Sequence, residues 1–328
     1  MDVEGARFRL GEARGHYESW FVRGNHPTRP LAFWFRYTVT SPANRPQDGV
    51  AELFAIVFDG ERGRHFVARE KLALSDAMFP SAGLDVRIGS ARLTRDHASG
   101  AANGESRIAW DLHVSGGTAP LLLLPENLYT GGFPRAKSVV MRPNVTFSGP
   151  VHVGTDKIDV TGWTGSVNHN WGERHTDRYA WGQVAGFTDA PDAFLELISA
   201  RIAVGPLLTP AMTPLVLRWR GREYRLNKLS KLFGRAHVKG LVWTFKAKGE
   251  GIAVRGTIRA APVDMVTLFY TNPPGGQKLC VNTKIGSCEL DITSPDGNAR
   301  LYSPHGAAFE LLVDKLADTG VAHLPEPL

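Results

Sequence analysis

The sequence lacks several features that would place a chain in a class at once. Only two cysteines, Cys280 and Cys288, occur among 328 residues, which excludes a disulfide-stabilised secreted scaffold and favours reduced cytosolic thiols. The turn-like residues KIGS between them also allow the two to face each other in a hairpin. No run approaches the roughly 18 uninterrupted apolar residues of a membrane-spanning helix. The N-terminus, MDVEGARFRL, has no apolar core of a secretory signal. We therefore expect a soluble, cytoplasmic protein.

A strong excess of one charge is also missing. The chain carries 38 Lys and Arg residues against 32 Asp and Glu residues, a formal net charge of +6, which does not by itself indicate nucleic acid. Ten of the cations lie between Arg218 and Lys248, where Glu223 is the one acid. This basic 218–248 segment fits a patch that steers an anionic substrate or makes peripheral contact with acidic lipid headgroups. It also fits the solvated face of two hairpins. No nucleic-acid-binding module accompanies it, so we expect no nucleic-acid partner.

Helical stripes are scarce, whereas alternation with period two dominates the chain. The segment Ala307–Ala317 fits either a strand or a short helix. Strands of this length and spacing, separated by many glycine and proline turns, predict an all-β fold of antiparallel barrels or sandwiches. The clearest expected strands are Leu31–Thr40, Val50–Asp59, Arg107–Ser115, Val263–Tyr270 and Lys278–Thr293, with hairpins over residues 215–226 and 242–258.

The length of the chain predicts two domains, because 328 residues exceed the size at which one hydrophobic core usually stops growing. The boundary is expected near Asn144–Gly165, after a long connection punctuated by proline and glycine. The predicted domains are residues 1–160 and 161–328, with a comparable number of strands in each.

Residues 165–187, GSVNHNWGERHTDRYAWGQVAGF, crowd histidines, tryptophans and amides into one short segment. His169, His175 and Asp177 match no zinc-ligand spacing, so we expect no metal. From residue 179 onwards the segment has the alternation of a strand. One face then carries small residues, as if pressed against something, and the other carries Tyr179, Trp181, Gln183, Ala185 and Phe187.

The returning strand, Ala193–Ile202, is apolar except for Glu196. A carboxyl group in such a setting must find a partner or stay protonated. If Phe187 lies opposite Phe194, Glu196 shares the face of Trp181. A neutral carboxylic acid in an aromatic pocket can protonate an alkene or a carbonyl, and each ring face would stabilise a cation by about 0.5–2 kcal/mol. Alternatively, Glu196 faces solvent at an edge or pairs with an arginine, and the tryptophans are core anchors.

These residues carry a resemblance to a known superfamily. Gly162-Trp163, His169-Asn170-Trp171-Gly172, Tyr179-Ala180-Trp181 and Phe194-Leu195-Glu196 resemble the AttH-like and carotenoid 1,2-hydratase (hydroxyneurosporene synthase) group. Tocopherol cyclase and fungal Diels–Alderases are more distant relatives. Glu18-Ser19-Trp20-Phe21 and Ala32-Phe33-Trp34 resemble the start of the group's first domain. The resemblance implies two tandem lipocalin-like antiparallel β-barrel domains.

The resemblance also implies site residues. In the hydratases, a His-x-Trp pair and a Tyr-x-Asp pair are implicated in protonating and hydrating an isoprenoid double bond. By position these pairs fall on His169 and Trp171, and on Phe194 and Glu196. Phenylalanine thus replaces the tyrosine and glutamate replaces the aspartate, so the acid is retained and the phenol is not.

Together these features predict a protein that binds a lipophilic isoprenoid, polyene, steroid or polyketide-like molecule in an apolar cavity. A cofactor-free hydratase or cyclase, of the lyase or isomerase class, would hydrate, cyclise or isomerise it. Glu196 would be the general acid, oriented by His169 or receiving a proton from it, with Trp171 beside them. The predicted substrate-binding residues are Tyr179, Trp181, Gln183, Phe194 and Trp34. Two alternatives remain: a non-catalytic carrier, and a structural protein whose barrels are filled by their own side chains.

Overall fold

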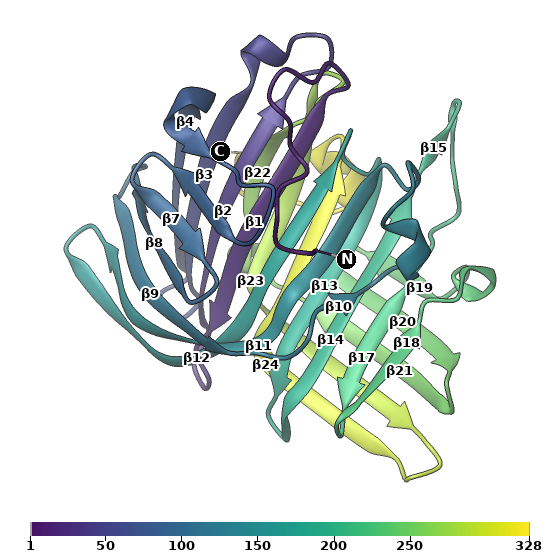
Figure 1. Cartoon of the computed structure of the whole chain (residues 1–328). Helices are drawn as coiled ribbons and strands as arrows, with labels where there is room; N and C mark the ends of the chain where they lie inside the picture. Colours follow the sequence, from purple (N-terminus) through teal and green to yellow (C-terminus); the bar gives the residue numbers. More distant parts are fainter. Residues whose placement is uncertain (1, 328) are drawn as a thin grey trace. The chain divides into compact units, whose positions relative to one another are not determined.

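The computed structural model describes residues 2–327 and has no α-helix in that range. Strands make up 61% of the chain, and most belong to two large antiparallel sheets (Figure 1). The expected all-β class is therefore confirmed. The chain divides into two compact units. Unit 1 comprises Met1–Leu121, Gly132–His175 and Thr271–Gly276, and unit 2 comprises Leu122–Gly131, Thr176–Tyr270 and Gln277–Leu328.

Sheet A of unit 1 is a nearly closed barrel. Its strand order is β4-β3-β2-β1-β12-β11-β9-β8-β7-β6-β5. Aromatic residues fill its interior: the Phe35 and Trp110 rings stack with centroids 4.4 Å apart, and Trp110 Nε1 donates to the Tyr37 hydroxyl over 3.0 Å. The strands are β1 (His16–Asn25), β2 (Leu31–Ser41), β3 (Val50–Asp59), β4 (Arg64–Ala73), β5 (Ala77–Met78), β6 (Asp85–Ile88), β7 (Ala91–Thr94), β8 (His97–Ala102), β9 (Ile108–Gly116), β11 (Ala136–Val153) and β12 (Asp156–Gly172).

Sheet B belongs to unit 2 and has the order β18-β17-β14-β13-β24-β23-β21-β20-β19, with β22 paired to β23. Two short strands, β15 (Ala203–Val204) and β16 (Leu207–Leu208), form a separate hairpin. The strands of sheet B are β13 (Arg178–Phe187), β14 (Ala190–Arg201), β17 (Leu215–Trp219), β18 (Arg222–Leu226), β19 (Ala236–Lys239), β20 (Val242–Gly249), β21 (Ile252–Arg259), β22 (Val266–Thr271), β23 (Gln277–Thr293) and β24 (Ala299–Val313).

The remaining elements are short. β10 (Leu121–Leu122) falls where the chain changes unit, and single 3-10 turns connect strands elsewhere. No helix within residues 2–327 is long and apolar enough to cross a membrane. The 3-10 turns are η1 (Pro46–Asp48), η2 (Leu74–Asp76), η3 (Glu126–Leu128), η4 (Leu229–Lys231), η5 (Pro262–Asp264) and η6 (Leu316–Thr319).

The first unit extends further along the chain than the predicted boundary at residue 160. β12 pairs along its length with β11 and, from Thr164 onwards, with β1, so the chain leaves sheet A only after Gly172. The motif residues His169 and Trp171 therefore belong to unit 1, not to the second domain.

Most local expectations for strands and turns are confirmed. The two predicted hairpins turn at Arg220-Gly221 and Glu250-Gly251, where all four residues have positive φ, as two-residue hairpin turns require. Ala307–Ala317 is mainly the end of β24, not a helix. The KIGS residues do not turn: β23 runs through them with register shifts, so Cys280 and Cys288 lie in one strand. Both cysteines are free and buried, and they do not face each other across a hairpin.

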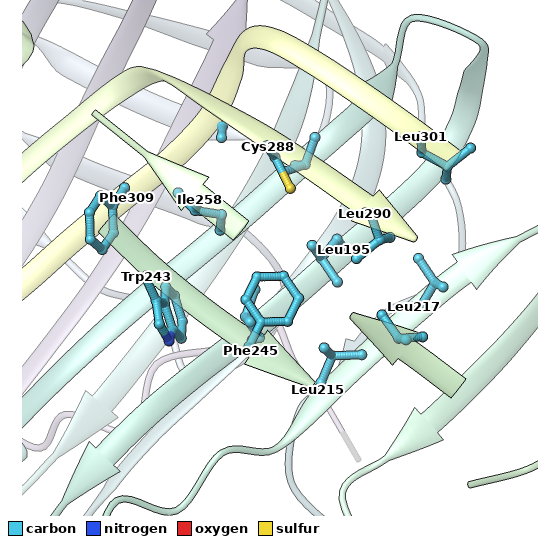
Figure 2. Packing of buried hydrophobic residues seen from close by; sticks show 14 of the residues in the cluster. Leu195, Leu215, Leu217, Trp243, Phe245, Ile258, Cys288, Leu290, Leu301 and Phe309 are labelled. Atoms are coloured by element: carbon cyan, nitrogen blue, oxygen red, sulfur yellow. The ribbon is translucent and has the colours of Figure 1, made fainter. Parts of the chain in front are cut away.

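Sheet B curls until its ends meet, and it encloses one of its faces. Beside β19, Arg235 Nη1 donates to the Leu226 carbonyl of β18 over 2.6 Å, although the two strands end the hydrogen-bonded path. The enclosed face is filled by hydrophobic side chains from β13, β14, β17, β18, β20, β21, β23 and β24. Figure 2 shows Trp243, Phe245 and Leu195 packed within this cluster.

The small face of β13 faces that cluster. A Cβ atom at Gly182 would lie 2.6 Å from Ile258 Cδ1 and 2.9 Å from Trp243 Cζ3. The expectation that the small residues are pressed closely against other groups is therefore confirmed. The inside of unit 2 is filled by the protein's own side chains.

Candidate functional site

The β13–β14 hairpin places Glu196 on the predicted face but in a different register. Gln183 lies opposite Glu196, and Phe194 lies opposite Ala185 rather than Phe187. The predicted register is wrong by two positions because a bulge at Gly186, whose φ is 90°, shortens the pairing near the turn. A shift of two preserves the face of every side chain, so Glu196 still shares a face with Trp181 and Gln183. The same bulge turns Phe187 into the hydrophobic cluster.

The carboxyl group of Glu196 is held by two donors from β13. Trp181 Nε1 donates to Oε1 over 2.8 Å, and Gln183 Nε2 donates to Oε2 over 2.9 Å. Glu196 is only 3% exposed, which excludes the alternative of a glutamate facing solvent at a sheet edge. The two donors fix the plane of the carboxyl group and suit its ionised form, whereas burial disfavours that form.

Glu196 does not lie in a hollow inside the barrel. Its neighbours Leu195 and Leu197 belong to the packed cluster, where Figure 2 shows Leu195. Alternation along β14 therefore points Glu196 to the opposite face of sheet B. The apolar cavity expected around this acid is therefore not the enclosed side of sheet B. We call the opposite face, carried by β14, β13, β24 and β23, the Glu196 face.

Tyr129, from the segment Leu122–Gly131, has a phenol whose pKa is affected by the charge of Glu196. Burial raises the pKa of the Tyr129 phenol above its usual range; hydrogen bonds from the backbone at Leu124 and Leu123 oppose this, and the charge of Glu196 adds to it. The Leu124 N–H donates to the phenol oxygen over 3.3 Å. The charge of Glu196 thus acts on a phenol from another segment of unit 2, whereas Phe194 has no phenol.

A buried ion pair, which the sequence analysis missed, lies on the same face. Lys284 Nζ donates to Glu310 Oε1 over 2.7 Å and to Asn282 Oδ1 over 2.8 Å, and the lysine side chain is fully buried. The same ammonium lies 5.3 Å from the centroid of the Trp181 ring. The Tyr179 hydroxyl donates to Glu310 Oε2 over 3.4 Å.

The sequence indicates a buried charge at Glu310 but not at Lys284. Glu310 interrupts the apolar run AAFELLV in the way that Glu196 interrupts AFLELI, so the same argument would have found it. Lys284 lies in the KIGS residues, which look like a turn because bulges use the same residue types.

His169, predicted to orient Glu196, makes other contacts within unit 1. Its Nε2 is 2.7 Å from Glu18 Oε1 and its Nδ1 is 2.8 Å from the Val3 carbonyl. Both ring nitrogens thus contact oxygen atoms of unit 1. The ring also stacks on Trp20 at a centroid distance of 4.7 Å. Trp181 and Gln183 thus perform the orienting contacts that the sequence assigned to His169.

Glu18 is the centre of a second polar cluster, which fixes the N-terminal segment on sheet A. Its carboxylate accepts the backbone N–H groups of Arg7 and Phe8 and contacts His16 Nε2 at 2.9 Å, besides His169. Burial would raise the pKa of Glu18, but the hydrogen bonds from His16 and His169, and the charges of these imidazoles, lower it to about 2. The contacts of this cluster attach the N-terminal segment to β1 and β12, which is a structural role.

The two other predicted site residues in unit 1 also pack against neighbours on sheet A. Trp171 contacts the His169 ring at 4.8 Å and has the Arg7 guanidinium 4.8 Å from its ring centroid. Trp34 is 1% exposed and packs against Phe54 of β3, with ring centroids 6.2 Å apart. The predicted set is therefore divided: Tyr179, Trp181, Gln183, Phe194 and Glu196 belong to unit 2, whereas His169, Trp171 and Trp34 belong to unit 1.

Two tandem β-barrel units of this kind define the AttH-like fold, and solved structures confirm the resemblance at the level of the fold. NE1406 of Nitrosomonas europaea, an AttH candidate, aligns with a TM-score of 0.62 and 14% identity over 95% of this chain and 97% of its own. Kievitone hydratase from Nectria haematococca aligns with a TM-score of 0.52 and 11% identity over 93% and 90% of the two chains. CghA with Sch210972 aligns with a TM-score of 0.52 and 11% identity over 95% of each chain.

Sequence comparison gives relatives without a stated activity. The proteins Rv0493c and MT0513 of two Mycobacterium tuberculosis strains, H37Rv and CDC 1551, are both described as uncharacterized. Each is 24% identical over 286 residues, which cover 85% of this chain and 82% of the relative. No family model matches the chain.

Proposed function

We propose that the Glu196 face binds a lipophilic small molecule of the isoprenoid, polyene, steroid or polyketide-like class and transforms it by acid–base catalysis without a cofactor. The observation that carries this proposal is a carboxyl group, 3% exposed, with each oxygen held by a donor from the neighbouring strand. Fixing a proton-transfer group in one orientation before the substrate arrives is a main source of catalytic rate.

The proposed reaction returns the proton that it uses. Glu196 in its acid form donates a proton to a carbon of a double bond or to a carbonyl oxygen, which leaves a cation on the substrate and a carboxylate on the enzyme. Water adds to that cation in hydration, whereas a second double bond adds in cyclisation. The product then loses a proton to the carboxylate, so no oxidant, reductant or other co-reactant is needed. The rings of Trp181 and Phe194 would stabilise the cation by about 0.5–2 kcal/mol each.

The fold of two structural neighbours supports this choice. Kievitone hydratase is a hydratase by name, and CghA is described with Sch210972. The same two-unit scaffold therefore accommodates a hydratase and a protein described with a small molecule. In this chain, Trp181 and Gln183 would be the positioning residues, and Glu196 the catalytic one.

A carrier function is the second candidate. Both oxygens of Glu196 already accept hydrogen bonds from the protein, as in a structural carboxylate. Phe194 also stands where the hydratases have a tyrosine. In this case Glu196 would accept a hydrogen bond from a polar group of the ligand and transfer no proton.

The test compares the protein with Glu196→Gln and with Glu289→Gln, whose glutamate forms surface ion pairs on β23. Each protein is incubated with retinol, farnesol and a steroid alkene. Mass spectrometry detects addition of one water, or a new isomer of equal mass, and quenching of tryptophan fluorescence reports binding. We expect product from the wild type and Glu289→Gln, and saturable binding without product from Glu196→Gln. Unchanged turnover in Glu196→Gln contradicts the proposal, and saturable binding without product in all three proteins supports the carrier.

A further inference from the structure

Six of the ten cations of the basic 218–248 segment fall into two groups in the structure. On the β17–β18 hairpin, Arg218 is 2.6 Å from Glu223 Oε2, Arg225 is 2.5 Å from Glu223 Oε1, and Arg222 is 3.9 Å from Asp296 Oδ2. Each of these three arginines thus has a carboxylate partner, and Arg218 and Arg225 share Glu223. This part of the segment matches the expectation of a solvated hairpin face.

The second group of cations lines a groove. Lys231, Lys246 and Lys248, together with Arg255 of β21 from outside the segment, are exposed around a groove of about 780 Å³ on the outer side of β20, β21 and β23. Within residues 2–327, none of these four forms an ion pair. The one acid in the lining, Asp291, lies 3.8 Å from Arg300. The groove therefore presents four exposed cations against one carboxylate.

Two of these cations repel each other across the sheet. Lys246 of β20 lies directly opposite Arg255 of β21 in the strand register. Like charges at opposed positions destabilise an antiparallel pair. A second groove of about 440 Å³ shares both residues and continues along the strands. Asp291 of β23 lies opposite Arg255 on its other side and offsets part of this repulsion, and an anion bound beside Lys246 would offset more of it.

Large hydrophobic side chains are exposed at the same edge of unit 2. Phe233, which lines the groove, is 53% exposed, and Leu229 is 55% exposed. On the β15–β16 hairpin, Val204 is 67% exposed and Leu207 is 73% exposed. Figure 1 shows β15 in a hairpin that extends beyond the strands of sheet B.

Backbone contacts place the hairpin and the groove loop side by side. Met212 forms isolated bridges with both Ala200, at the base of the hairpin, and Phe233. The Thr213 N–H also donates to the Leu232 carbonyl over 2.9 Å. The exposed hydrophobic side chains and the unpaired cations therefore occupy adjoining segments.

We propose that this edge of unit 2 docks on the surface of a bilayer that contains anionic lipids. Val204, Leu207, Leu229 and Phe233 enter the boundary between headgroups and acyl chains, while Lys231, Lys246, Lys248 and Arg255 bind lipid phosphates. Stable attachment to a membrane surface usually needs an apolar and an electrostatic contribution together, and this edge supplies both. The inference is independent of the chemistry at Glu196.

The experiment is co-sedimentation of the full chain with vesicles of phosphatidylcholine alone or mixed with phosphatidylglycerol. We expect binding only to the anionic vesicles, and weaker binding at high salt, because the screening length falls from about 10 Å at 0.1 M to about 3 Å at 1 M. The double variant Lys246→Gln/Arg255→Gln should lower the partition coefficient roughly 25-fold, about fivefold for each cation. Leu207→Ser should lower it roughly tenfold at any salt concentration.

The matched control is Lys71→Gln/Lys157→Gln, which removes two exposed cations from unit 1 and should leave binding unchanged. The thermal unfolding temperature of the groove variant is measured beside its binding, and a value unchanged from the wild type shows that a loss of binding is not caused by misfolding. Equal binding to neutral and anionic vesicles, or equal binding by the groove variant and the control, overturns the proposal. Calorimetric binding of inorganic phosphate without any vesicle binding also overturns it, in favour of a small-anion site.

Discussion

Gln183 and Glu196 lie directly opposite each other on β13 and β14, and the amide nitrogen of the first donates to Oε2 of the second over 2.9 Å. Together with Trp181 Nε1, this contact gives a buried carboxyl group one defined orientation. Changing this contact therefore tests whether the orientation of the Glu196 carboxyl group matters for function.

Replacing Gln183 with leucine should separate orientation from binding. The variant keeps the size of the side chain but removes one donor, and a misplaced proton-transfer group costs up to about 100-fold in rate. We expect a fall in kcat of that order, a shifted pH profile and little change in KM. Gln277→Leu, an exposed glutamine on β23, is the control. A change confined to KM would contradict a positioning role.

The sequence predicted the face of Glu196 because alternation depends only on parity. A register error of two positions at the Gly186 bulge left Glu196 beside Trp181 and Gln183. Alternation could not show which face of β14 is enclosed, because the residues on both faces of this strand are mostly apolar. The curvature of the whole sheet decides which face is enclosed, and a pattern within one strand cannot predict that curvature.

The contacts of His169 were unpredictable for another reason. Its neighbours Glu18 and Trp20 lie about 150 positions earlier in the chain, and they meet it only because β1 pairs with β12. The family resemblance correctly indicated the fold. It also singled out His169, but it did so from the position of this residue in the sequence, which does not show what the side chain contacts. Here the contacts of His169 hold the N-terminal segment.

A methyl group at Gly182 should destabilise unit 2. The added Cβ would lie 2.6 Å from Ile258 Cδ1 and 2.9 Å from Trp243 Cζ3, inside the packed cluster. Overpacking of this kind costs about 1–3 kcal/mol, and urea unfolding of Gly182→Ala would measure it. For Gly132→Ala, where no atom lies within 4 Å, the change should stay within about 0.5 kcal/mol. Equal stability of the two variants would show that sheet B is not packed as described.

Stability should depend on the ionisation of Glu18. Its pKa is lowered from the ordinary value of 4.5 to about 2 in the folded protein. A lowered pKa means that Glu18 contributes its full stabilisation above pH 4.5 and loses it as the pH falls towards 2. The linkage amounts to about 3 kcal/mol. The difference in unfolding free energy between wild type and Glu18→Gln should shrink by this amount on acidification, and a constant difference would contradict it.

Replacing His169 should damage structure rather than chemistry. His169→Ala removes one hydrogen-bond partner of the buried Glu18 carboxylate, a loss that costs about 1–3 kcal/mol. Residues 3–8 should become susceptible to limited proteolysis, while the folded fraction keeps its turnover per molecule. His152→Ala, at an exposed position of β11, serves as the control. Loss of turnover in a fully folded His169→Ala protein would return this histidine to the catalytic residues.

The most direct test of the central claim follows the proton itself. Any polyene, prenyl or steroid substrate that is converted through protonation of a carbon should be converted in heavy water, and the product analysed for deuterium bonded to carbon. If Glu196 delivers the proton, the wild type will yield product with solvent deuterium at that carbon, and Glu196→Gln will yield none. Product from the wild type without deuterium, or the same deuterated product from Glu196→Gln, would contradict the account.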